Sequence, residues 1–151
     1  CGFSFAWKFG PLAAYFVDDW ALRAPLDLTP WARLLLRADQ VGMVRLGPPH
    51  PNLTGEIGMY PEGWALRLDR RGFAFGHRPA LYHRRMIDFF GPFDERVSAL
   101  ECERLYNERF AKFDDRSPER RGPDVVLALP HPWEHVGRAE VGDVSPRERP
   151  P

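Results

Sequence analysis

Apolar side chains recur at helical spacing over residues 94–115, the most regular pattern in the chain. The apolar positions, three or four residues apart, are Ala99, Cys102, Tyr106, Phe110 and Phe113. This spacing places them on one face of a helix, with charged residues on the other side. Asp94 or Ser98 can begin the helix, because either side chain can accept a hydrogen bond from an amide of the first turn. We therefore predict a helix with an aromatic face that other parts of the structure cover.

The first nine residues alternate between aromatic and small or polar side chains. The aromatic positions are Phe3, Phe5, Trp7 and Phe9. A period of two is typical of a strand with one aromatic face. Two interpretations stay open for this strand: a place in the chain's own sheet, or an anchor in a groove of another protein.

Shorter elements fill the first third of the chain between breaks at Gly and Pro. The spacing of Leu12, Phe16 and Trp20 predicts a short helix over residues 12–23. A second helix is expected to begin at Thr29-Pro30, since a capping side chain followed by Pro is typical of a helix start. Its buried face would contain Trp31, Leu34, Leu35 and Ala38. Residues 41–46 are expected to form a strand.

The middle of the chain predicts a hairpin followed by two helices. Residues 64–68 and 73–77 are apolar at alternate positions and flank a polar turn, which indicates a hairpin over residues 64–77. Pro79 is expected to open a short helix through Phe90, with Tyr82 and Met86 facing inward. A break at Gly91-Pro92 would let this helix and the helix at 94–115 pack as a helical corner. Residues 125–129 are expected to form a short strand.

These elements predict an α+β fold with low regular content, several short helices, and extended proline-rich segments. We divide the chain into four parts. They are an aromatic strand with short helices (1–46), a Pro/Gly-rich linker (47–63), the hairpin with the helical corner (64–116), and an extended C-terminal tail (117–151).

Composition adds two constraints to this pattern. Sixteen of the 151 residues are proline, about twice the average usage, and each proline limits the length of a helix or strand. Aromatic residues make up 13% of the chain. We infer that the chain carries more aromatic surface than its short elements can bury, so that partners cover the remainder.

The charges argue against a nucleic-acid-binding protein. The chain has 21 basic and 21 acidic residues and no net charge, whereas binding by phosphate neutralisation needs a basic excess. Lys8 and Lys112 are the only lysines, and arginine is the better residue for interface ion pairs and for stacking on aromatic rings. The arginine pairs at 70–71, 84–85 and 120–121 could contact phosphates or lipid headgroups, although such pairs more often lie in solvated turns or pair with nearby acidic residues.

One histidine motif resembles a metal site. His131-Pro-Trp-Glu-His135 matches the H-x-x-E-H pattern of inverted zinc peptidases, in which two His bind zinc and the Glu activates water. The resemblance implies zinc ligands at His131 and His135 and a base at Glu134, all on one helix. Gly137 interrupts such a helix, and the resemblance covers five residues. We therefore expect no metal here, but a loop whose histidines form local hydrogen bonds.

The N-terminus also resembles an enzyme family. Cys1-Gly2-Phe3 is similar to the start of class II glutamine amidotransferases, which implies Cys1 as a nucleophile activated by its own amine. Arg121-Gly-Pro-Asp124 resembles a fragment of the asparagine-synthetase branch of that family. The family's Asn-Gly oxyanion pair is missing, because Asn52 precedes Leu and Asn107 precedes Glu. We expect no catalytic residue and no cofactor.

The function that fits these patterns is that of a non-catalytic accessory subunit of a large protein assembly. We expect a mitochondrial respiratory-chain or ATP-synthase complex, peripheral to the inner membrane, because the longest apolar run (residues 9–17) is too short to span a bilayer. The alternatives are a mitoribosomal or other ribonucleoprotein subunit, and a small amidotransferase-like or metal-dependent hydrolase. The expected partner-contact residues are Phe3, Phe5, Trp7, Phe9, Trp20, Trp31 and Trp133.

Overall fold

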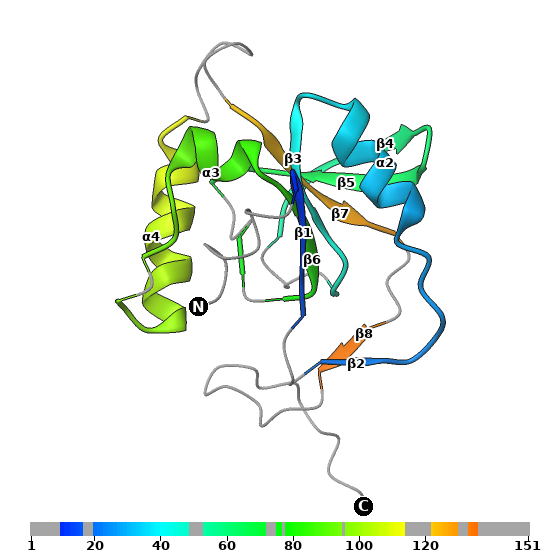
Figure 1. The fold of residues 1–151 in the computed structure, drawn as a ribbon, viewed down its shortest axis with the longest axis horizontal. Coiled ribbons are helices and arrows are strands. Elements are labelled where there is room, and N and C mark those ends of the chain that lie inside the picture. The colour runs from blue at the N-terminus through cyan, green and yellow to red at the C-terminus, as the bar shows by residue number, and fades with distance from the viewer. Residues whose placement is uncertain are drawn as a thin grey trace, which may run out of the picture.

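The computed structural model has mixed α and β structure, as the sequence predicts (Figure 1). It describes residues 10–16, 20–48, 53–71, 75–76, 78–94, 96–113, 122–129 and 133–135. In this part of the chain, a six-stranded sheet lies between α2 on one side and α3 with α4 on the other (Figure 1). A separate two-stranded sheet lies below it in the same view.

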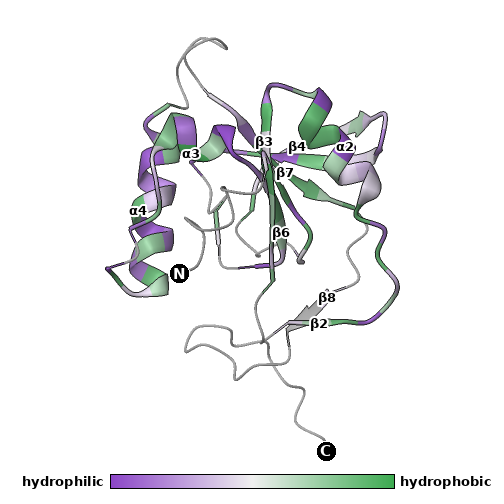
Figure 2. Cartoon of the chain, in the orientation of Figure 1, coloured by the Kyte–Doolittle hydropathy of each residue, from purple (hydrophilic) through white to green (hydrophobic). Residues whose placement is uncertain are grey.

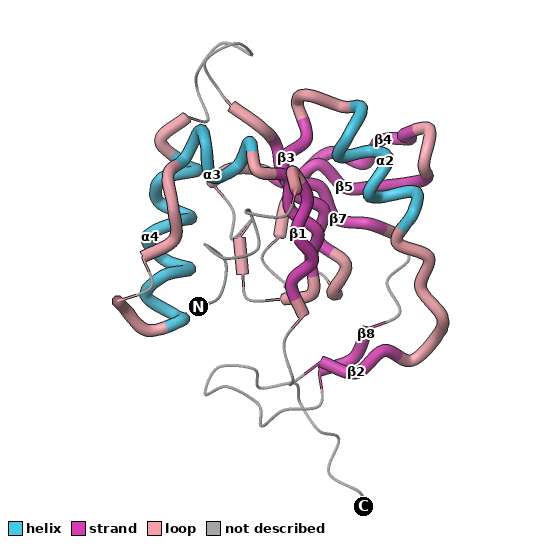
Figure 3. The backbone as a smooth tube through the Cα atoms, viewed as in Figure 1, coloured by secondary structure: helices cyan, strands magenta, loops and turns pink. Residues whose placement is uncertain are grey.

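The strands of the large sheet are not in chain order (Figure 3). Across the sheet they are β1 (Leu12–Tyr15), β6 (Ala80–His83), β3 (Val41–Arg45), β7 (Asp124–Ala128), β5 (Gly63–Leu68) and β4 (Gly55–Tyr60). Strands β3 and β7 are parallel, and the other neighbours are antiparallel. The central pair therefore joins two segments that are far apart in the sequence.

Three helices and one further strand pair complete the described structure. The helices are α2 (Thr29–Arg37), α3 (Arg85–Phe90) and α4 (Ala99–Ala111). The second sheet pairs β2 (Trp20–Leu22) with β8 (Trp133–His135) in antiparallel register.

The sheet is apolar on both faces because helices cover both faces. Along β7, Val125 and Leu127 pack in the cluster beneath α3 and α4, whereas Val126 packs in the cluster beneath α2. All three side chains are at most 1% exposed. A continuous apolar run is typical of such a doubly covered strand, which is why the predicted strand at 125–129 is confirmed.

The α4 side of the core is mainly aromatic. Rings of Phe75, Phe93 and Tyr106 pack together, with centroids 4.7 Å apart for Phe75–Tyr106 and 4.4 Å for Phe93–Tyr106. Phe90 and Phe110 adjoin them, with centroids 5.4 Å apart. Figure 2 shows apolar residues along the strands and mixed polarity around α4. Much of the aromatic surface in the described residues is thus buried within the chain, which leaves less of it for partners to cover than the sequence suggests.

The helix predicted to begin at Thr29-Pro30 is confirmed as α2, which covers the opposite face of the sheet. Trp31, Leu34 and Leu35 are buried against the sheet. The first turn differs in detail, because the Asp27 carboxylate accepts the Thr29 amide at 2.8 Å and Thr29 itself makes no cap. Hydrogen bonding from the Thr29 side chain, and then from this amide, holds the pKa of Asp27 below its usual value.

Two predicted helices are wrong where strands form instead. Residues 12–15 and 20–22 are strands β1 and β2, not one helix over 12–23. Residues 80–83 are strand β6, so the helix predicted from Pro79 begins only at Arg85. Strand pairing decides the structure here. β6 pairs with β1 on one side and with β3 on the other, and its Tyr82 side chain is completely buried. Tertiary pairing of this kind overrides the local apolar spacing.

The hairpin is also shifted toward the N-terminus. Residues 64–68 lie in β5 as predicted, but β5 pairs with β4 on one side and with β7 on the other, so neither edge is left for the predicted partner strand. Residues 73, 74 and 77 of that predicted strand lie outside the described residues. The turn is Pro61-Glu62, and Gly63 follows it with φ 139°, a value that favours glycine. Phe75 cannot continue a strand, because its N–H and C=O are bonded by the Asn107 side chain, both at 2.8 Å. Strand β4 therefore lies inside the range predicted as a linker (47–63).

Helix α4 is shorter than predicted. It begins after Ser98, whose hydroxyl accepts the Glu101 amide at 3.3 Å, and it ends at Ala111. Asp94 accepts hydrogen bonds from Arg96 instead, which lowers the pKa of Asp94 to about 2. The predicted buried positions Cys102, Tyr106 and Phe110 are confirmed.

Replacing Ser98 tests the start of α4. Ser98→Ala removes the side-chain acceptor, and we expect the free energy of unfolding to fall by about 1 kcal/mol. Ser98→Asp keeps an acceptor at this position and should match the original chain within about 0.5 kcal/mol. Urea denaturation of the purified full chain measures both. Equal losses in the two variants would contradict this assignment of the helix start.

The buried tyrosines predict a loss of stability in alkali. Burial raises the pKa of Tyr82 and of Tyr106, whose hydroxyl also donates to the Met86 carbonyl at 3.2 Å. Because the folded state holds these protons more tightly, their stabilisation is complete below the unfolded pKa of about 10 and is lost as the pH rises above it. Urea denaturation between pH 8 and 11 measures this fall. A Tyr106→Phe variant should show a smaller fall over the same range, and an equal slope would refute the explanation.

Candidate functional site

Three large apolar side chains lie together in solvent on the β4–β5 hairpin. Ile57 is 68% exposed, Met59 75% and Trp64 55%. Met59 faces Trp64 across the strand pair, and Ile57 faces Leu66, so all of them lie on one face of the hairpin. We call Ile57, Met59 and Trp64 the hairpin surface.

The position of the sheet edge explains this exposure. Leu66 and Leu68 of β5 lie on the same face and pack against the aromatic core beneath α3 and α4. Ile57 and Met59 are one strand further out, on the last strand of the sheet. The hairpin surface therefore continues the apolar face of the sheet beyond the part that α3 and α4 cover.

Other exposed apolar side chains in the described residues are distributed over different elements. They are Phe16, Leu22, Leu36, Phe89 and Leu100. Phe16 stacks on Trp133, with ring centroids 5.5 Å apart. Leu36 and Leu100 lie on separate helices, and single apolar residues of this kind are normal on a protein surface.

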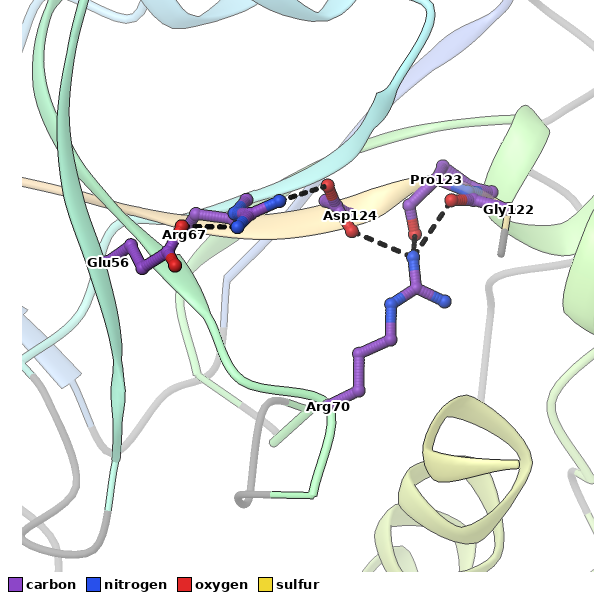
Figure 4. A network of polar contacts seen from close by, with 6 residues as sticks. All are labelled: Glu56, Arg67, Arg70, Gly122, Pro123 and Asp124. Carbon is purple, nitrogen blue, oxygen red and sulfur yellow. Dashed lines mark hydrogen bonds and ion pairs between the residues drawn. The ribbon is translucent and has the colours of Figure 1, made fainter. Parts of the chain in front are cut away.

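A polar pocket of about 400 Å³ opens beside the hairpin. Its walls are Thr54, Gly55, Glu56, Arg67, Leu68, Asp69, Arg70 and Asp124. These residues come from both strands of the hairpin, from the turn after β5, and from the start of β7. Figure 4 shows the charged groups pointing toward one another across the strands.

Arg70 is the centre of this network. One terminal nitrogen donates to the Asp124 carboxylate at 2.8 Å, to the Gly122 carbonyl at 2.8 Å and to the Pro123 carbonyl at 3.0 Å (Figure 4). The guanidinium carbon lies 4.3 Å from the centre of the Phe110 ring. Arg70 is 2% exposed, so of the two places expected for this arginine, a solvated turn or a pair with a nearby acid, the structure shows the pair with an acid.

The other charged groups of the pocket also have partners within the chain. Arg67 forms an ion pair with Glu56 and lies 3.9 Å from Asp124. The Thr54 hydroxyl donates to the Asp69 carboxylate at 3.2 Å. These contacts tie the end of β5 to the start of β7 and give each charged group of the pocket a polar partner within the chain, so we assign the pocket a structural role.

The predicted contact residues fall into three groups. Phe3, Phe5, Trp7 and Phe9 lie outside the described residues. Trp31 is 8% exposed and belongs to this chain's own core. Trp20 and Trp133 are half-buried at the small sheet, where the Arg78 guanidinium lies 5.1 Å from the Trp20 ring.

The two enzyme-like motifs are not assembled in the described residues. Trp133–His135 is a strand, not part of the helix that the zinc-peptidase resemblance implies. His131 and Cys1 lie outside the described residues. Within the described ranges, no three His, Cys, Asp or Glu side chains are close enough to hold a metal ion.

No helix in the described part of the chain is both long enough and apolar enough to cross a bilayer. Comparison of the whole chain with protein-family models, with curated proteins and with solved structures gives no match.

The sequence interpretation missed the hairpin surface because it assigned residues 47–63 to a linker. One pattern could have found it. Ile57 and Met59 alternate with Glu56 and Gly58, and Pro61-Glu-Gly63 follows as a turn. Gly55, Gly58 and the nearby prolines are typical of a linker, and they led to that assignment in place of a strand.

The buried Arg70–Asp124 pair predicts that replacing Arg70 destabilises the chain far more than replacing an exposed arginine does. Arg70→Met leaves the buried Asp124 carboxylate without its closest guanidinium, with only Arg67 at 3.9 Å, and we expect the free energy of unfolding to fall by about 3 kcal/mol. Arg84→Met is the control, since Arg84 and Asp88 form a pair that is 59% and 60% exposed. That variant should lose at most about 0.5 kcal/mol. Urea denaturation compares them, and similar losses would contradict the structural role of the network.

Proposed function

We propose that this chain is a non-catalytic accessory subunit of a larger protein assembly and that it joins the assembly through the hairpin surface. The observation that carries this proposal is the exposure of Ile57, Met59 and Trp64 side by side. Contiguous apolar side chains in solvent are typical of sites that bind other proteins. Trp and Met are also enriched in protein interfaces.

The composition of the surface supports the same use. Trp64 is the side chain in this set that would contribute most, because tryptophan is frequent among residues that dominate binding energy.

The aromatic content of the chain is a weaker reason to expect a partner than the hairpin surface. Rings such as Phe75, Tyr82 and Tyr106 are buried within the chain, so the hairpin surface replaces the aromatic surplus as the reason to expect a partner. Placement in a mitochondrial respiratory-chain or ATP-synthase complex stays a prediction. The purification described next tests it too, because the other subunits would be retained.

Polar substitution of the hairpin surface tests the proposal. The tagged full chain is purified under native conditions from its own cells, and retained proteins are quantified by mass spectrometry. We expect Ile57→Ser with Met59→Ser to lower the recovery of stoichiometric partners at least about tenfold, which corresponds to about 1.4 kcal/mol. The expected cause is the loss of apolar area from the interface.

The matched control carries Leu36→Ser with Leu100→Ser. These side chains are 53% and 68% exposed on α2 and α4 and are not part of the hairpin surface, so recovery should be unchanged. Circular dichroism checks that both variants fold. The proposal fails if the hairpin variant and the control retain the same proteins in the same amounts.

A further inference from the structure

Strand β4 is an edge strand that lacks the usual protection of sheet edges. Among the described residues it pairs with β5 alone, in an unbroken register. Natural edge strands are commonly guarded by lysine, proline or a bulge, which prevent another strand from adding. Residues 55–60 contain no lysine or proline, and their one charge, Glu56, is paired with Arg67.

The backbone of β4 presents hydrogen-bonding groups to this edge. The Trp64 carbonyl accepts the Leu129 amide at 3.1 Å, so the backbone of Trp64 faces away from β4. Met59 lies opposite Trp64. In an antiparallel pair, two opposite residues either bond to each other or both face outward. Met59, and with it Ile57 two residues away, therefore directs its N–H and C=O toward the free edge.

We infer that the partner at the hairpin surface is a second copy of this chain, whose β4 pairs antiparallel with the first β4 about a two-fold axis at Gly58. The inference rests on the proposed function, since it names the molecule that binds the same surface. In this register Ile57 faces Met59 of the second copy, and Met59 faces its Ile57. These are the residues whose backbone groups point outward, so both pairs bond reciprocally.

The sequence of β4 is self-complementary in this arrangement. A two-fold interface brings the same patch together from both copies, so each residue must suit its partner in both directions. Ile57 against Met59 places apolar side chains opposite each other on one face. Gly58 meets Gly58 without a clash, and Glu56 meets Tyr60, so no like charges oppose each other.

The size of the contact fits a second copy that dissociates on dilution. Each copy contributes one short strand with Ile57 and Met59, whereas Trp64 lies on β5, one strand further from the axis. An interface of this kind is small, and small interfaces are typical of weak complexes. The Glu56–Arg67 ion pair lies on the opposite face of the hairpin, so it need not be broken.

Cysteine cross-linking tests the register directly, in full-length chains that also carry Cys1→Ser. Gly58→Cys places the two new thiols opposite each other across the axis, at a Cα separation of about 4.5 Å that suits a disulfide. A Cβ at Gly58 meets only the Tyr60 ring, at 3.6 Å, so the cysteine fits. Glu56→Cys is the control, because its two copies would lie about 13 Å apart along the strands.

We expect mild oxidation to convert most of the Gly58→Cys chain to a covalent dimer and to leave Glu56→Cys monomeric. Light scattering of the unmodified chain should approach twice 17.4 kDa at high concentration. Ile57→Ser with Met59→Ser should raise the dissociation constant at least about tenfold. Equal cross-linking of both cysteine variants, or a monomeric mass at every concentration, would overturn the inference.

The same measurements separate this inference from the proposed function. If the chain is monomeric but Ile57→Ser with Met59→Ser releases a different protein, the inference fails and the proposed function stands. If the chain is monomeric and the substitutions release nothing, both fail.

Discussion

The burial of one arginine organises the described structure. The Arg70 guanidinium lies between the Asp124 carboxylate and the Phe110 ring, and it also reaches the carbonyls of Gly122 and Pro123. A buried cation is tolerated only where its charge and its donors are matched. Here the matching groups come from β7, from the segment before it and from α4. Arg70 thus fixes the end of β5 against both the sheet and the helical layer.

This constraint has a consequence at the other end of β5. With β5 held between β7 and β4, the hairpin is a fixed extension of the sheet, and its apolar face continues the face that α3 and α4 cover. Ile57 and Met59 are therefore held on a supported strand. A surface that is already ordered loses little entropy on binding, which favours its use as an interface. The polar pocket beside it serves the same end, because its ion pairs join the strands.

Local sequence patterns were sufficient where one element buries one periodic face. The buried positions of α2 and α4, and the apolar run of β7, follow from spacing alone. Spacing failed for Leu12–Tyr15 and Ala80–His83, whose strand character comes from pairing with each other across about 70 residues of chain. The role of Arg70 was hidden for a similar reason, since Asp124 is 54 residues away. The hairpin surface was missed because Gly55, Gly58 and Pro61 resemble a linker.

The position of β7 has a consequence for the synthesis of the chain. Strand β7 lies between β3 and β5, yet it is made after both of them and after the helices α2, α3 and α4. Until Asp124–Ala128 leaves the ribosome, the β1–β6–β3 half and the β4–β5 half have no strand to join them. The growing chain must therefore carry unpaired edges on β3 and β5, which are prone to wrong associations. Completion of the sheet is a late event that closes contacts distant in sequence, a step that is intrinsically slow.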